Sequence, residues 1–198
     1  MLVEETSVPL AALPIAQFKS HLRLGTGFAD DAVQDTVLES FLRAAIAAVE
    51  ARTGKVLIER DFSWSLTAWR TADAQALPVA PVRSVISVVS KGPFGEETIA
   101  PSDTHFLRDD PHRPVLCSTT SALPTVPKFG EVEVTFVAGY GSNWDDVPPD
   151  LAHAVLLLAA HYYQYRAETG LGDGCMPFGV SALLQRFRPV RVAMGYGQ

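Results

Sequence analysis

Apolar residues recur at helical spacing in two stretches near the start of the chain. In 31–53, the apolar residues that follow one another at intervals of four are Val37, Phe41, Ala45 and Val49. This spacing aligns them along one face of a helix, and Gly54 is the residue type that favours a left-handed C-terminal cap. A shorter stretch, 15–22, shows the same period after Pro14, which suits a first helical turn. We therefore predict two helices over these ranges.

Between Val56 and Ala138 the period changes from helical spacing to two. Apolar and polar residues alternate, or β-branched residues gather, in short segments at about 61–67, 82–90, 98–99, 106–108, 114–117 and 131–138. Such segments are typical of strands. They are separated by turn signals such as Gly92-Pro93-Phe94-Gly95. Short strands joined by tight turns pair mainly antiparallel, so we predict an antiparallel sheet.

A third helix, from Pro148 to about Arg166, is apolar on more than one side. One stripe consists of Leu151, Val155, Leu158, Tyr162 and Tyr165, and a second of Ala154, Leu157 and His161. A helix of this kind must be covered on more than one side, and a neighbouring subunit is the simplest additional cover. We therefore assign the second stripe to a subunit interface. Phe94, at the tip of a predicted turn, is a further interface candidate that could also fold back onto the sheet.

The chain ends in a short predicted helix, about 180–187, followed by a locally basic tail. No acidic residue occurs after Asp173. The candidate docking residues of this region are Arg186, Phe187, Arg188, Val190, Arg191, Val192, Met194 and Tyr196. Their apolar members alternate, and an isolated alternating segment is drawn to the sheet edge of another chain. A frayed terminus remains the alternative.

Together these elements predict an α+β fold. It consists of a small bundle of about four helices with an inserted, mainly antiparallel β-sheet subdomain. We treat 1–198 as a single domain, with helical parts at about 14–54 and 148–187, a β insert at about 56–140, and a docking tail at about 188–198. A chain of 198 residues is long enough to bury a core without covalent staples.

Composition narrows the class of protein. The formal net charge is −6, which argues against a protein that coats nucleic acid, because neutralising phosphates needs a basic excess. The two cysteines, Cys117 and Cys175, are too few for a disulfide scaffold or a thiolate zinc site. Glu4 and Glu5 stand where a secretion signal would need basic residues. The longest apolar stretch, about 13 residues, is shorter than the roughly 20 that span a bilayer. We expect a protein without a membrane segment, made in a reducing cytoplasm.

Catalytic motifs are scarce. The sequence contains no phosphate-binding glycine loop, nucleophile elbow or zinc-binding His-Glu-x-x-His helix. The best metal-like cluster is Asp103, His105, Asp109, Asp110 and His112. Carboxylates and imidazoles bind divalent cations, but this spacing fits no familiar loop, and a solvated hairpin is favoured. We therefore expect no catalytic residue, no metal and no cofactor, and we keep a metal-dependent hydrolase using this cluster as one alternative.

The order of several segments resembles the head–tail connector (adaptor) proteins of long-tailed phages and gene transfer agents. The most specific pieces are Glu50-Ala51-Arg52-Thr53-Gly54 and Phe136-Val137-Ala138-Gly139-Tyr140-Gly141. The other segments lie at 21–24, 77–85, 147–151 and 161–163. The resemblance covers about 10–188.

The resemblance implies a non-enzymatic role. Such proteins form a ring, usually of twelve subunits, beneath the portal of a DNA-filled capsid, and the ring extends the portal channel. The implied partners are other copies of the chain, the portal protein and a tail-side stopper or terminator protein. DNA passes without sequence-specific binding, and the net acidity suits such a conduit. The implied location is the head–tail junction of a particle made in a bacterial host. A monomeric binding module remains the other alternative.

Overall fold

The computed structural model describes residues 1–24, 31–166 and 176–188. Within them, four α-helices lie at the two ends of the sequence, as predicted. They are α1 (Ile15–His21), α2 (Asp31–Thr53), α3 (Pro149–Gln164) and α4 (Phe178–Leu184). Short 3-10 helices are η1 (Leu10–Ala12), η2 (Ser102–Thr104), η3 (Trp144–Asp146) and η4 (Gln185–Phe187). The predicted helix at 180–187 is therefore α4 followed directly by η4.

The described residues also form eight strands in two antiparallel sheets. The strands are β1 (Leu2–Glu4), β2 (Arg60–Leu66), β3 (Ala74–Ala76), β4 (Val82–Lys91), β5 (Glu97–Ile99), β6 (His105–Arg108), β7 (Val115–Ser118) and β8 (Glu131–Ala138). The first sheet has the order β1-β2-β8-β4-β5 and the second β3-β7-β6. The predicted α+β class and the antiparallel pairing are confirmed. Two short strands, β1 and β3, were not predicted, and the former joins the N-terminus to the sheet.

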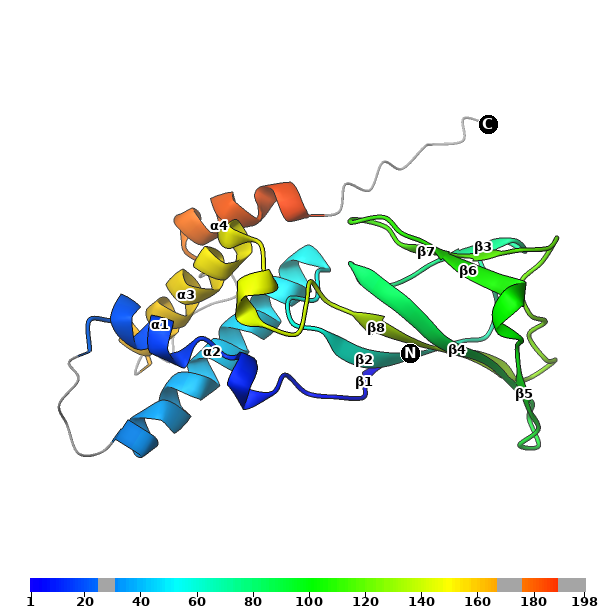
Figure 1. Ribbon diagram of the computed structural model, residues 1–198, viewed down its shortest axis with the longest axis horizontal. Coiled ribbons are helices and arrows are strands. Elements are labelled where there is room, and N and C mark those ends of the chain that lie inside the picture. The colour runs from blue at the N-terminus through cyan, green and yellow to red at the C-terminus, as the bar shows by residue number, and fades with distance from the viewer. Residues whose placement is uncertain (25–30, 167–175, 189–198) are drawn as a thin grey trace.

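The helices gather at one end of the molecule and the sheets at the other (Figure 1). The helical end has its own core, in which Phe18, Leu42, Val155 and Leu158 are fully buried. In the sheets, alternation along β8 directs Val132, Val134, Phe136 and Ala138 into a second core. Thus the change of period that divides the sequence also divides the fold.

The second apolar stripe of α3 is covered largely by the chain itself. The helix packs against α1, α2 and α4, and it lies between α2 and α4 in Figure 1. Part of the cover that the sequence led us to expect from a neighbouring subunit therefore comes from the chain itself, and the assignment of the second stripe to a subunit interface stays a prediction. The short helix at 178–184 folds back onto α3. Together with α1 and α2 it covers much of the apolar surface of α3 that would otherwise be exposed.

A buried ion pair joins the helical end to the first sheet. Arg60, at the start of β2, is 6% exposed and donates from Nη2 to Glu50 Oε2 of α2 at 2.7 Å. The Leu57 N–H donates to the other oxygen of Glu50, also at 2.7 Å. Burial raises the pKa of Glu50, against the opposing effects of Arg60 and the Leu57 N–H. Both carboxylate oxygens therefore fix the chain between α2 and β2.

Candidate assembly surfaces

The predicted docking segment begins within the folded core. Phe187 is buried against the helical core, and Arg186 Nη2 lies 2.8 Å from Asp150 Oδ2 at the start of α3. Arg188 is exposed. The remaining predicted docking residues, Val190, Arg191, Val192, Met194 and Tyr196, lie outside the described residues. Residues 186 and 187 thus anchor the base of the tail, and its docking role stays a prediction.

The predicted subunit-interface residues of α3 differ in their exposure. Ala154 has no exposed surface within the chain, whereas Leu157 and His161 are half-buried. The His161 ring lies 4.7 Å from that of Tyr165, and its Nε2 is buried without a hydrogen-bond partner among the described residues. The interface prediction for this helix therefore depends on Leu157 and His161.

Phe94 projects from the molecule. It lies in the turn between β4 and β5 and is 91% exposed, so it does not fold back onto the sheet. Glycines on both sides give the turn its shape, and Gly95 has the positive φ of +90° that favours this residue type. An exposed aromatic side chain on a hairpin tip is available to a partner.

A second apolar surface, which sequence reasoning missed, lies between β4, β5 and β6. Ile86, Ile99 and Phe106 are 56%, 70% and 49% exposed and line a groove of about 450 Å³. The alternation of apolar and polar residues in the sequence predicted a strand for each of these three residues, but it did not reveal which face of the sheet remains exposed to solvent. Exposed apolar residues gathered around one groove are typical of surfaces that bind other proteins.

The residues of the metal-like cluster do not converge on one common point. Asp110 Oδ1 accepts hydrogen bonds from the N–H groups of His112 at 2.7 Å and Arg113 at 2.8 Å, and these bonds lower the pKa of Asp110. Burial lowers the pKa of His105, and Asp103 opposes this. No group of three His, Cys, Asp or Glu side chains among the described residues is placed to hold a metal ion. The cluster is spread over η2, β6 and the turn that follows β6, and nothing in its geometry supports the hydrolase alternative.

None of the described helices combines the length and the apolar character that crossing a membrane requires. The described surfaces instead combine a projecting aromatic residue, Phe94, and an apolar groove. Such features are typical of a protein that docks onto other protein surfaces.

Solved structures identify the family. The chain is similar, at 49% identity and a TM-score of 0.89 over 100% of both chains, to one in the neck of an empty gene transfer agent particle treated with C6 symmetry. A chain from the virion of a native gene transfer agent particle is 49% identical over 98% of both chains, with a TM-score of 0.85. A third, from the neck of a native particle with C12 symmetry, is 45% identical over 100% of both chains, with a TM-score of 0.83.

No family model matches the sequence, and no curated protein matches it either. The identity and the full coverage are nevertheless decisive. This chain belongs to the head–tail connector (adaptor) family of gene transfer agents and long-tailed phages, as the order of its sequence motifs indicated.

Proposed function

We propose that this chain forms a ring beneath the portal, extends the DNA channel, and joins the head of a phage-like particle to its tail. It is a structural adaptor of the head–tail junction. The observation that carries the proposal is the match over the full length of both chains to a neck protein. Because the match includes both the helical end and the sheets, the proposal applies to the whole chain and not to one part of it.

The ring is proposed to contain twelve copies. Particle necks that contain the relatives were treated with C6 and with C12 symmetry, and a ring of twelve is compatible with both because twelve is a multiple of six. The proposed role is non-enzymatic. The portal protein and a tail-side stopper or terminator protein are the proposed partners above and below the ring. A net charge of −6 lets DNA pass without being held through its phosphates.

Deletion of the gene for this chain, with and without complementation, tests the proposed function. Without the chain, DNA-filled heads and free tails are expected to accumulate separately, and complementation is expected to restore tailed particles. Electron microscopy of the complemented particles is expected to place the chain in a ring at the neck. Normal tailed particles in the deletion strain would overturn the proposal.

Truncation after Arg188 tests the tail. This end point keeps Phe187 in the core and preserves the ion pair between Arg186 and Asp150. The truncated chain is expected to keep its circular dichroism spectrum and to lose co-purification with the portal protein. A chain of full length in which Arg191 alone is replaced by Lys is the matched control, since it keeps both charge and alternation. Undiminished portal binding by the truncated chain would remove the tail from the mechanism.

A further inference from the structure

Three arginines surround a cavity on the second sheet. The cavity measures about 300 Å³ and is lined by Arg70, Arg108 and Arg113, with Ala74, Ala76 and Val115 among its apolar residues. In the register of the sheet, Ala76 pairs with Val115 and Val115 with Arg108, so these residues share one face. Leu116, the next residue of β7, faces the opposite way and is fully buried in the core shared with the first sheet. The arginine-lined cavity is therefore on the outer face.

The arginine side chains of this cavity are without partners in the described part of the chain. All three residues are exposed, and among residues 1–24, 31–166 and 176–188 no ion pair or side-chain hydrogen bond involves their guanidinium groups. Asp110 also lines the cavity, and its lowered pKa keeps it ionised at neutral pH. The cavity thus carries three positive charges and one negative charge in a chain whose net charge is negative. Guanidinium groups bind carboxylates in a bidentate manner, so a surface bearing carboxylates fits this cavity.

Such a surface lies on the other side of the β region, at the edge formed by β1. It is the acidic edge, which consists of Glu4, Glu5 and Asp61. Glu4 pairs with Phe62 in the register of the sheet, so it points to one face of the edge, and Glu5 and Asp61 point to the other. The Glu5 N–H donates to the Asp61 carbonyl at 2.9 Å, so these two residues lie opposite each other on adjacent strands. Like charges in such a position destabilise a sheet.

The acidic edge is only partly neutralised within the chain. Glu4 lies 3.4 Å from Arg60, but Arg60 also pairs with the buried Glu50. Glu5 accepts a hydrogen bond from Ser63 Oγ. A carboxylate has about four acceptor positions, so both glutamates retain unused ones. The edge therefore keeps excess negative charge and the capacity to accept more hydrogen bonds.

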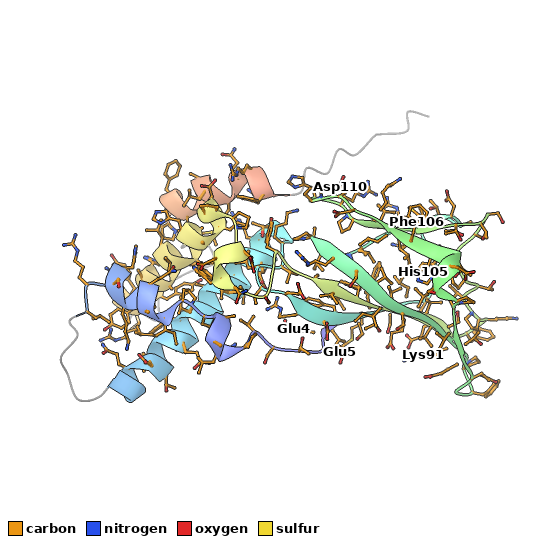
Figure 2. The ribbon with its side chains drawn as sticks, viewed as in Figure 1. Glu4, Glu5, Lys91, His105, Phe106 and Asp110 are labelled. Atoms are coloured by element: carbon orange, nitrogen blue, oxygen red, sulfur yellow. The ribbon has the colours of Figure 1, made fainter. Side chains whose placement is uncertain are left out.

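The two surfaces face in opposite directions at similar positions along the molecule. Figure 2 shows Glu4 and Glu5 on one side of the β region and Asp110 on the other, at a comparable distance from the helical end. Copies placed side by side would bring the acidic edge of one against the arginine-lined cavity of the next. A cyclic ring requires such a contact between two different surfaces, repeated at every subunit.

We propose that the arginine-lined cavity binds the acidic edge of a neighbouring copy of this chain. This inference rests on the proposed ring. Exposed Val3, on the same face of β1 as Glu5, provides apolar contact for Ala74 and Ala76 of the cavity. A DNA backbone fits less well, because the ionised Asp110 within the cavity repels a continuous row of phosphates.

Cysteine cross-linking in assembled particles tests this interface. The chain carrying both Glu5→Cys and Arg108→Cys is expected to form disulfide-linked dimers and higher oligomers when particles are oxidised and then dissolved without reductant. Each single variant keeps the two native cysteines and is the matched control, expected to remain monomeric. Tailed particles that contain the double variant yet release only monomers would overturn the interface while leaving the proposed function intact. Absence of the unaltered chain from the neck would instead overturn the proposed function.

Exchange of charge across the interface provides the second test. Arg108→Glu together with Arg113→Glu is expected to lower incorporation into particles at least tenfold, and adding Glu5→Arg is expected to restore most of it. Lys128→Glu, which makes the same change of charge as either single replacement but elsewhere in the β region, is expected to have no effect. Loss of DNA retention with normal incorporation and no rescue by Glu5→Arg would identify DNA as the ligand and overturn the proposal.

Discussion

The ion pair between Glu50 and Arg60 is the most informative place to perturb the fold. Replacing Glu50 by Ala removes the acceptor for the Leu57 N–H and the close partner of a guanidinium that is 6% exposed. Glu4, at 3.4 Å and largely exposed, compensates poorly. Removing one member of a buried ion pair leaves the other charge buried without its partner, which costs about 3–5 kcal/mol. We therefore expect Glu50→Ala to lower the free energy of unfolding by that amount.

Neutralising both members is expected to cost far less. In Glu50→Gln with Arg60→Met, the amide oxygen still accepts from Leu57 and no buried charge remains. Replacing a buried ion pair by neutral groups of similar volume is often close to neutral. Most of the loss in Glu50→Ala should therefore reflect the charge that is left behind.

The pH dependence of stability gives a second readout of the same site. Because burial raises the pKa of Glu50 above its ordinary value near 4.5, the folded chain binds this proton more tightly than the unfolded chain does. The resulting stabilisation is complete below the ordinary value and is lost as the pH rises through the higher folded value. Glu50→Gln is expected to abolish this part of the pH dependence.

Urea unfolding, followed by circular dichroism and tryptophan fluorescence, measures these effects. Glu39→Ala is the matched control, because Glu39 lies on the same helix and pairs with Arg43 near the surface. Such a pair contributes about 0.3–0.5 kcal/mol. A loss below about 1 kcal/mol for Glu50→Ala, or a double variant as unstable as the single one, would refute the reasoning.

The remaining predictions concern two turns and one exposed tip. Phe94→Ala should change the free energy of unfolding by less than about 0.5 kcal/mol, because Phe94 is 91% exposed; a fall in particle incorporation without a change in urea unfolding would mark an interface. Gly139→Ala should lower the free energy of unfolding by about 1–3 kcal/mol, because the added Cβ would lie 2.4 Å from a backbone Cα of another segment of the chain. Gly54→Ala should show only the backbone strain of its φ of +66°, because the space around it is open. Equal melting temperatures for the two variants would contradict this. The pKa of Asp110 is lowered by the N–H of His112 and that of the next residue. The stabilisation that these two hydrogen bonds give is present above the ordinary pKa of Asp110 and is lost as the pH falls through the lower folded value. The NMR chemical shifts of the two amide groups should change over that pH range, and shifts that show no transition there would contradict the prediction.

Local sequence patterns were sufficient for most of the elements. The period of about four in 31–53 and the period of two in 131–138 predicted α2 and β8 with the bounds that they have. The period in 131–138 also describes the buried face of β8, whereas in α2 the predicted stripe is displaced at its start, because Val37 is 42% exposed and Leu38 is buried instead. Strands β1 and β3 were missed because three residues are too few to establish a period. Their existence depends on pairing with β2 and β7, which are distant in sequence.

The assembly surfaces were only partly predictable. Phe94 was identified because an aromatic residue between turn residues is unusual, although the structure was needed to establish its exposure. Arg70, Arg108 and Arg113 are spread over more than forty positions, so no local pattern connects them. The pairing of β6 with β7 and of β7 with β3 brings them around one cavity.

The sequence by itself determined the two kinds of secondary structure, where the chain changes from one to the other, and, through its ordered motifs, the family. These properties depend on neighbouring residues or on short segments read in order. The tertiary structure decided that α4 packs on α3 and which side chains remain exposed. It also decided that Asp110, which lines the arginine-lined cavity, lies on the opposite side of the β region from Glu4 and Glu5 (Figure 2). Those properties arise from contacts between distant segments, whose geometry no local pattern of residues specifies.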